Sequence, residues 1–194
     1  MSVLSREEFD AIEFDAASTG EHEAAAERML MLARSGTESL SLARAEAFVR
    51  AGEQWLLADN ALEAARSFRL AIADGGPVEI DPRVPLCRAL FQLGQPAEAY
   101  ALLGRVKEDG RTDPRTCDMV MEALVEQSDL PGALEWADAG VEYVLRNAPR
   151  GSGEDVPDPR EDPGSGLRDL LRLRYRIRND LRLPEDDYDR MLSD

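Results

Sequence analysis

The sequence predicts an all-α protein in which antiparallel helix-turn-helix repeats stack as an α-solenoid and a C-terminal helix caps the array. Three observations support this prediction. Apolar residues recur every three or four positions along most of the chain, which is the period of a helix face. Turns rich in glycine, proline, aspartate and asparagine separate these segments. Small residues return at near-constant intervals, as in a repeat.

Residues 45–76 contain the clearest pair of helices. Gly52 and Trp55 lie on one stripe of the expected first helix, and Ala64 and Phe68 lie on one stripe of the second. The small residues let two helix backbones approach closely, while the aromatic side chains fill the seam between them. Two such short helices bury too little apolar surface to persist alone, so we expect them to need stacked neighbours.

Turn and capping residues mark where the expected helices begin and end. Ser5 and Glu8 have the spacing of a capping box at the start of the first helix. Asp59 and Asn60 suit a turn and a helix cap, and Thr112 and Asp113 are both capping candidates for the helix that follows them. Gly75 is expected to end the helix before it. These signals divide the first three quarters of the chain into four helical pairs.

The four pairs share a register. An alanine stands early in each second helix, and the separations between these alanines are 39, 35 and 34 residues (Ala25, Ala64, Ala99 and Ala133). With this spacing, about residues 6–147 resemble the tetratricopeptide repeats, a family of helix-turn-helix units about 34 residues long. Several first helices lack the aromatic and small residues usual in that family, so the copies here are degenerate.

The C-terminal part of the chain differs in composition. After the repeat array at 1–147, residues 148–166 are rich in proline, glycine and acids and are expected to form a linker or loop. Residues 167–194 are expected to form an arginine-rich helix and an acidic tail. Together with the degenerate repeats, the ending LPEDDYD resembles the repeat region of actinobacterial SEC-C-type proteins. The cysteine cluster of their zinc motif is absent here, so the resemblance carries over no zinc site.

Acidic side chains dominate the charge of the protein. The 39 aspartates and glutamates outnumber the 23 lysines and arginines, which gives a net charge of −16. Such a surface repels nucleic acid over most of its area and favours a basic partner. The first residues include several acids and no apolar run follows them, so we expect a cytoplasmic protein without a membrane partner.

The sequence offers no constellation of residues for catalysis. Its single histidine, His22, stands between two glutamates at the expected start of a helix, where we expect it to be exposed or to cap the helix. Cys87 and Cys117 lack the spacing of a metal site and are expected to be buried thiols. No phosphate-binding loop, nucleophile elbow or metalloprotease motif occurs. We therefore expect a non-catalytic protein without a cofactor or a bound metal.

The family resemblance implies a binding face. In tetratricopeptide arrays the first helices line a concave groove that selects a protein or peptide. The side chains of this first-helix face are Glu46, Val49, Glu53, Leu56, Asp81, Val84, Arg88, Phe91, Gln92, Arg115, Asp118, Glu122 and Val125. Acids replace the lysine and asparagine set with which chaperone-binding members hold a carboxylate. We therefore expect an adaptor or scaffold that binds a basic or amphipathic peptide.

The arginine-rich segment has three interpretations. As a helix it places apolar residues on one face and arginines on the others. Such a helix can cover the apolar face of the last repeat as a structural cap. Alternatively, its arginines contact phosphate groups or nucleic acid, or the helix binds a partner or a second copy of the chain. The arginines available for an anion contact are Arg172, Arg174, Arg176 and Arg178.

Overall fold

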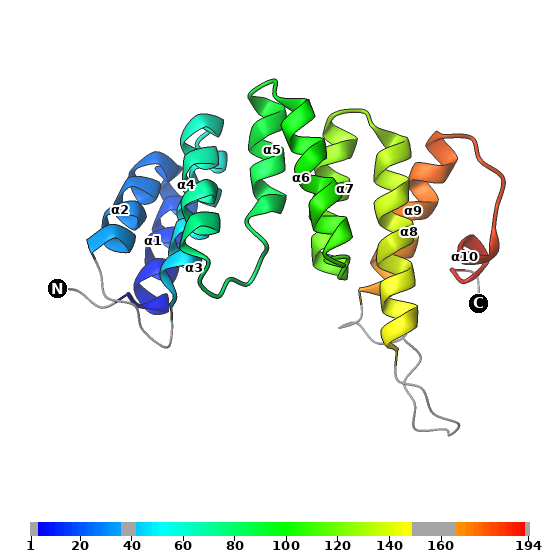
Figure 1. Ribbon diagram of the computed structural model, residues 1–194, viewed down its shortest axis with the longest axis horizontal. Coiled ribbons are helices and arrows are strands. Elements are labelled where there is room, and N and C mark those ends of the chain that lie inside the picture. Colours follow the sequence, from blue (N-terminus) through cyan, green and yellow to red (C-terminus); the bar gives the residue numbers. More distant parts are fainter. Residues whose placement is uncertain (1–3, 36–41, 149–165, 193–194) are drawn as a thin grey trace. The chain divides into compact units, whose positions relative to one another are not determined.

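The protein is all-α in the computed structural model, which describes residues 4–35, 42–148 and 166–192 (Figure 1). Within those ranges every regular element is a helix, which confirms the all-α part of the predicted fold class, whereas the stacking of the helices as a solenoid stays a prediction. The chain divides into two compact units, Met1–Gly104 and Arg105–Asp194. No helix in the described ranges is both long enough and apolar enough to cross a lipid bilayer.

The unit Met1–Gly104 is built from helices that pack in chain order from α1 to α5. Its helices are α1 (Arg6–Thr19), α2 (His22–Ser35), α3 (Arg44–Leu57), α4 (Ala61–Asp74), α5 (Arg83–Gln92) and the first part of α6 (Pro96–Glu108). Tyr100 of α6 meets Phe91 of α5 edge-on, with 5.3 Å between ring centroids. Apolar side chains from the predicted helix stripes, such as Phe9 and Met29, are fully buried in its core.

Among its described residues, the unit Arg105–Asp194 contains the end of α6 and four further helices. These are α7 (Pro114–Glu126), α8 (Leu130–Asn147), α9 (Leu167–Asp180) and the short α10 (Asp187–Arg190). Helix α8 packs against both α7 and α9. The α9 side chains Leu167, Leu170, Leu171 and Ile177 are buried. The arginine-rich segment is therefore a helix that contributes one apolar face to the core of its own unit.

A tight helix contact in the first unit joins Gly52 of α3 to Phe68 of α4. A Cβ atom added to Gly52 would lie 2.5 Å from Cε1 of Phe68, so the two carbon atoms would overlap. Phe68 itself is fully buried. The predicted seam of one small and one aromatic residue is thus confirmed. A comparable seam lies in the other unit, where a Cβ on Gly140 would come 3.1 Å from Sγ of Cys117 and from Cδ1 of Leu170.

Most of the predicted caps form as expected, and one does not. Asn60 accepts a hydrogen bond from the N–H of Glu63 at 3.3 Å, and Asp113 caps α7 in the same way. The predicted capping box at the start of α1 is wrong. Ser5 is the N-cap but forms no side-chain capping bond, and Glu8 instead pairs with Arg28 of α2.

A buried arginine fastens α1 to the rest of the first unit. Arg50 of α3 donates from Nε to Glu13 at 2.7 Å and from Nη2 to Asp10 at 2.5 Å, and both acceptors lie on α1. Its guanidinium lies 5.6 Å from the centre of the Phe9 ring. Its remaining nitrogen, Nη1, is buried without an acceptor among the described residues. These contacts attach a helix whose own apolar face is narrow.

The linker predicted at 148–166 lies outside the described residues except for its two end positions. The helices form consecutive pairs, which agrees with helix-turn-helix units. Their identity as copies of one repeat stays a prediction.

Candidate functional site

The structure buries part of the first-helix face. Val49, Val84 and Phe91 belong to the core of the first unit. Glu46 is also buried, and its Oε2 accepts a hydrogen bond from the backbone N–H of Glu79 at 2.9 Å. These four side chains have packing or capping roles in this conformation, and a partner cannot reach them without a rearrangement.

The other members of the first-helix face are more accessible. Half-buried members in the first unit are Glu53, Leu56, Asp81 and Arg88, and the exposed one is Gln92. Asp81 accepts hydrogen bonds from both the backbone and the side chain of Arg83. All the members on α7 are exposed, namely Arg115, Asp118, Glu122 and Val125. The accessible remainder of this face is mostly polar.

A surface pocket of about 760 Å³ lies in the first unit between α2, the end of α3 and the start of α4. We call it the acidic pocket, and its lining residues are Glu23, Glu27, Leu30, Met31, Arg34, Ser35, Trp55, Asn60 and Glu63. Sequence reasoning missed it because its walls come from three helices. One signal was present along α2, where Glu23, Glu27, Leu30 and Arg34 follow the spacing of a single helix stripe.

The floor of the acidic pocket is apolar. Leu30 and Trp55 are buried, whereas Met31 is 62% exposed. Trp55 is only 4% exposed, and its Nε1–H is buried without a hydrogen-bond acceptor among the described residues. A buried donor without an acceptor costs free energy, because it has lost its bonds to water.

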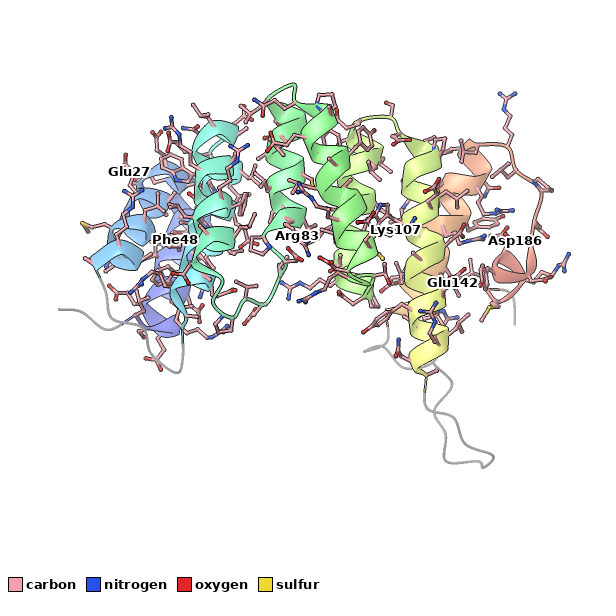
Figure 2. All side chains as sticks on the ribbon, viewed as in Figure 1. Glu27, Phe48, Arg83, Lys107, Glu142 and Asp186 are labelled. Atoms are coloured by element: carbon pink, nitrogen blue, oxygen red, sulfur yellow. The ribbon has the colours of Figure 1, made fainter. Side chains whose placement is uncertain are left out.

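Carboxylates line the rim of the acidic pocket. Glu23 and Glu27 are exposed one helical turn apart on α2 (Figure 2 labels Glu27), and neither forms an ion pair with any described residue. Glu63, on α4, pairs with Arg66. Of the lining residues that the structure describes, only Arg34 is cationic. The rim therefore carries an excess of negative charge above an apolar floor.

His22 lies close to the acidic pocket in sequence but does not line it. It was expected at the surface or as a cap, and it is instead half-buried, with Nδ1 2.9 Å from Oε1 of Gln54 on α3. The expected burial of Cys87 and Cys117 is confirmed, and burial raises the pKa of the Cys117 thiol to about 12. In the described ranges no group of histidine, cysteine or carboxylate side chains is arranged to hold a metal ion.

Two of the four predicted anion-contact arginines are occupied by carboxylates of the chain itself. Arg174 is 3% exposed and donates to Asp138 of α8 at 2.5 Å, and to Asp186 and Asp189 at 2.5 and 3.0 Å. Its guanidinium also lies 5.0 Å from the centre of the Tyr188 ring. We call these five side chains the arginine cluster. The segment that includes α10 is thereby attached to α8 and α9.

Arg178 strengthens the same attachment. It donates from Nε to Asp189 at 2.9 Å and from Nη2 to the carbonyl oxygen of Pro184 at 2.5 Å. Asp186, labelled in Figure 2, also caps α10 by accepting from the N–H groups of Tyr188 and Asp189. The hydrogen bond from Arg174 lowers the pKa of Asp186 to about 2.

The remaining two arginines stay accessible. Arg172 and Arg176 are exposed, and Arg172 makes an exposed contact with Asp169 at 3.4 Å on the same helix. Arg168 and Arg182 are exposed as well. An anion could therefore meet these four side chains, whereas Arg174 and Arg178 would first have to release their carboxylates.

Neither family models nor curated proteins nor solved structures match this chain. The tetratricopeptide and SEC-C-type resemblances therefore stay predictions, and the functional argument depends on the geometry of the acidic pocket and the arginine cluster.

Proposed function

We propose that this protein is a non-catalytic interaction module, an adaptor or scaffold that binds a peptide or another protein through its helical pairs. The observation that supports this best is the acidic pocket, an open site with an apolar floor and a charged rim. Burial of apolar groups supplies affinity in such sites, and the polar groups at the rim select the ligand. The accessible first-helix side chains on α5, in the first unit, and those on α7, in the second unit, are two further candidate surfaces, each taken by itself.

Affinity capture from the native host tests this proposal. The bait proteins are the wild type, a pocket variant (Glu27→Gln/Met31→Ser) and a first-helix variant (Asp118→Asn/Glu122→Gln), all with exposed substitutions that leave the cores intact. We expect one protein to be captured in near-stoichiometric amount by the wild type and to be lost with one of the two variants. Equal recovery of all proteins by the three baits would contradict the proposal.

A second candidate function is a contact with phosphate groups or nucleic acid through α9. It is supported by the exposed arginines of this helix, Arg168, Arg172 and Arg176, and by the exposed Arg182 just after its end. The net charge of −16 opposes it, because the rest of the surface repels a polyanion. Salt-dependent binding of DNA or RNA that is weakened by Arg172→Gln/Arg176→Gln would favour this function over the adaptor.

A further inference from the structure

We propose that the acidic pocket recognises a basic, amphipathic peptide segment, in which an apolar side chain contacts Leu30, Met31 and Trp55 while a neighbouring lysine or arginine pairs with Glu23 and Glu27. This inference rests on the proposed function, because it names the ligand class of the interaction module. It assigns the binding site to the wall formed by α2 and the α3–α4 turn, and not to the first-helix face.

The charge of the acidic pocket selects a cation. Glu23 and Glu27 are exposed, one turn apart, and form no ion pair with a described residue, so both can accept a guanidinium or ammonium group. Glu63 extends the negative rim on the opposite wall, although Arg66 already contacts it. Residues 1–104 contain 17 acidic and nine basic side chains, so the field of this unit also attracts a basic segment.

The floor selects an apolar side chain beside that cation. Met31 is largely exposed, and its flexible thioether can adapt to ligands of different shape. Leu30 and Trp55 are buried lining residues and are therefore less free to move than Met31. A volume of about 760 Å³ is sufficient for a few side chains but not for a folded domain.

The indole of Trp55 indicates that the ligand also brings a hydrogen-bond acceptor. Its Nε1–H is buried and has no acceptor among the described residues, at a residue that lines the acidic pocket. A backbone carbonyl of a peptide supplies such an acceptor, provided that the pocket rearranges enough to uncover this buried N–H. Cation, apolar side chain and carbonyl occur together in one short peptide segment, which distinguishes a peptide from a metal ion or a small organic cation.

The two tryptophans make this proposal directly testable by NMR. Trp55 lines the acidic pocket, and Trp136 lies in the other unit with its ring near Lys107, so the protein gives two indole N–H signals. Trp136→Phe assigns them. The probe is a short amphipathic peptide of leucine and lysine. Two comparison peptides keep its length, one with glutamate in place of every lysine and one with serine in place of every leucine.

We expect the leucine–lysine peptide to shift the Trp55 signal in a saturable manner and to leave the Trp136 signal in place. Replacing lysine by glutamate should abolish binding, and replacing leucine by serine should weaken it by about tenfold or more, because the apolar contact is lost. The double variant Glu23→Gln/Glu27→Gln should weaken binding about three- to tenfold, as expected for two exposed ion pairs. The control Glu7→Gln/Glu108→Gln removes the same charge from exposed sites outside the pocket and should bind as the wild type.

Three results would overturn the inference. Equal binding of the leucine–lysine and serine–lysine peptides would show only a general attraction of cations to an acidic protein. An equal loss of peptide affinity in the pocket variant and its control would also show only this general attraction. No change in the Trp55 signal at millimolar peptide would exclude the pocket as the site. The adaptor function is tested separately, by the capture experiment. If a captured partner binds on α7, the adaptor function stands and only the assignment of the peptide ligand to the acidic pocket is wrong.

Discussion

Each unit of the protein contains a buried arginine that lies beside an aromatic ring and is paired with carboxylates, but the two arginines differ in what surrounds their partners. Arg50 pairs with Asp10 and Glu13, and the Asp10 side chain is 58% exposed. Arg174 pairs with three aspartates, of which Asp189 is only 4% exposed in its side chain. The carboxylate partners of Arg50 thus contact solvent, whereas one partner of Arg174 is buried together with it.

The difference determines what each arginine does for stability. When a buried cation is removed, partners near the surface can turn toward water, but a partner that is itself buried keeps an uncompensated charge. Arg50 therefore attaches α1 through carboxylates that can be solvated if the arginine is lost. Arg174 is required for stability, because it and Arg178 compensate the negative charge of the buried Asp189.

The largest effect is expected for Arg174→Met. This change leaves the buried Asp189 with Arg178 alone and removes the ring contact with Tyr188, so it should lower the free energy of unfolding of its unit by about 3–5 kcal/mol. Urea unfolding followed by Trp136 fluorescence in a Trp55→Phe background reports on this unit. The matched control, Arg172→Met, changes an exposed arginine of the same helix and should have little effect. A loss no greater than that of the control would remove the contrast.

A smaller effect is expected for Arg50→Met. Asp10 and Glu13 can be solvated after the change, and the buried Nη1 without an acceptor is removed, so the first unit should lose about 1–2 kcal/mol. Trp55 fluorescence in a Trp136→Phe background measures it, and Arg28→Met, at an exposed arginine, serves as control. A loss as large as that of Arg174→Met would mean that solvation of the partners does not decide the cost.

The two buried cysteines allow the same comparison without denaturant. Cys87 lies in the first unit and Cys117 in the second, so the alkylation rate of each thiol reports how often its own unit opens. We expect Arg174→Met to accelerate labelling of Cys117 by about tenfold or more and to leave Cys87 unchanged. Arg50→Met should act on Cys87 instead, and more weakly. Acceleration of both thiols by one substitution would show that the units open together.

The smallest effect concerns acid. The pKa of Asp186 is lowered from 3.8 to about 2, so its charge favours the folded state above about pH 4, and this contribution is lost as the pH falls toward 2. Asp186→Asn keeps an N-cap for α10 but removes this dependence. NMR titration of the Asp186 carboxyl group in wild type and in Arg174→Met measures the shift. An unchanged pKa in Arg174→Met would exclude the guanidinium as its cause.

Local features of the fold follow closely from the sequence. The capping role of Asn60, the stop at Gly75 and the contact of Gly52 with Phe68 depend on residues close along the chain or on one repeated stripe. The capping box predicted at Ser5 does not form, and its absence could not be foreseen from nearby residues. Its glutamate is taken by Arg28 from the next helix, and this competing contact is not local.

The site residues were harder to predict because they depend on which helix faces meet. Arg172 and Arg174 look alike in composition, yet one is exposed and the other buried. Helical spacing did contain the distinction, since Arg174 stands four residues after Leu170 and three before Ile177, on the buried stripe. The acidic pocket combines three helices, so the sequence alone could supply only its α2 stripe.

The tight contact between Gly52 and Phe68 has a consequence for how this protein can change over evolutionary time. Position 52 can gain a methyl group only if position 68 becomes smaller, because the added carbon would overlap the ring. Either change alone lowers stability, through overlap in one order and through a cavity in the other. Substitutions at positions 52 and 68 are therefore expected to be coupled, because each residue limits the side chains that the other position can accept.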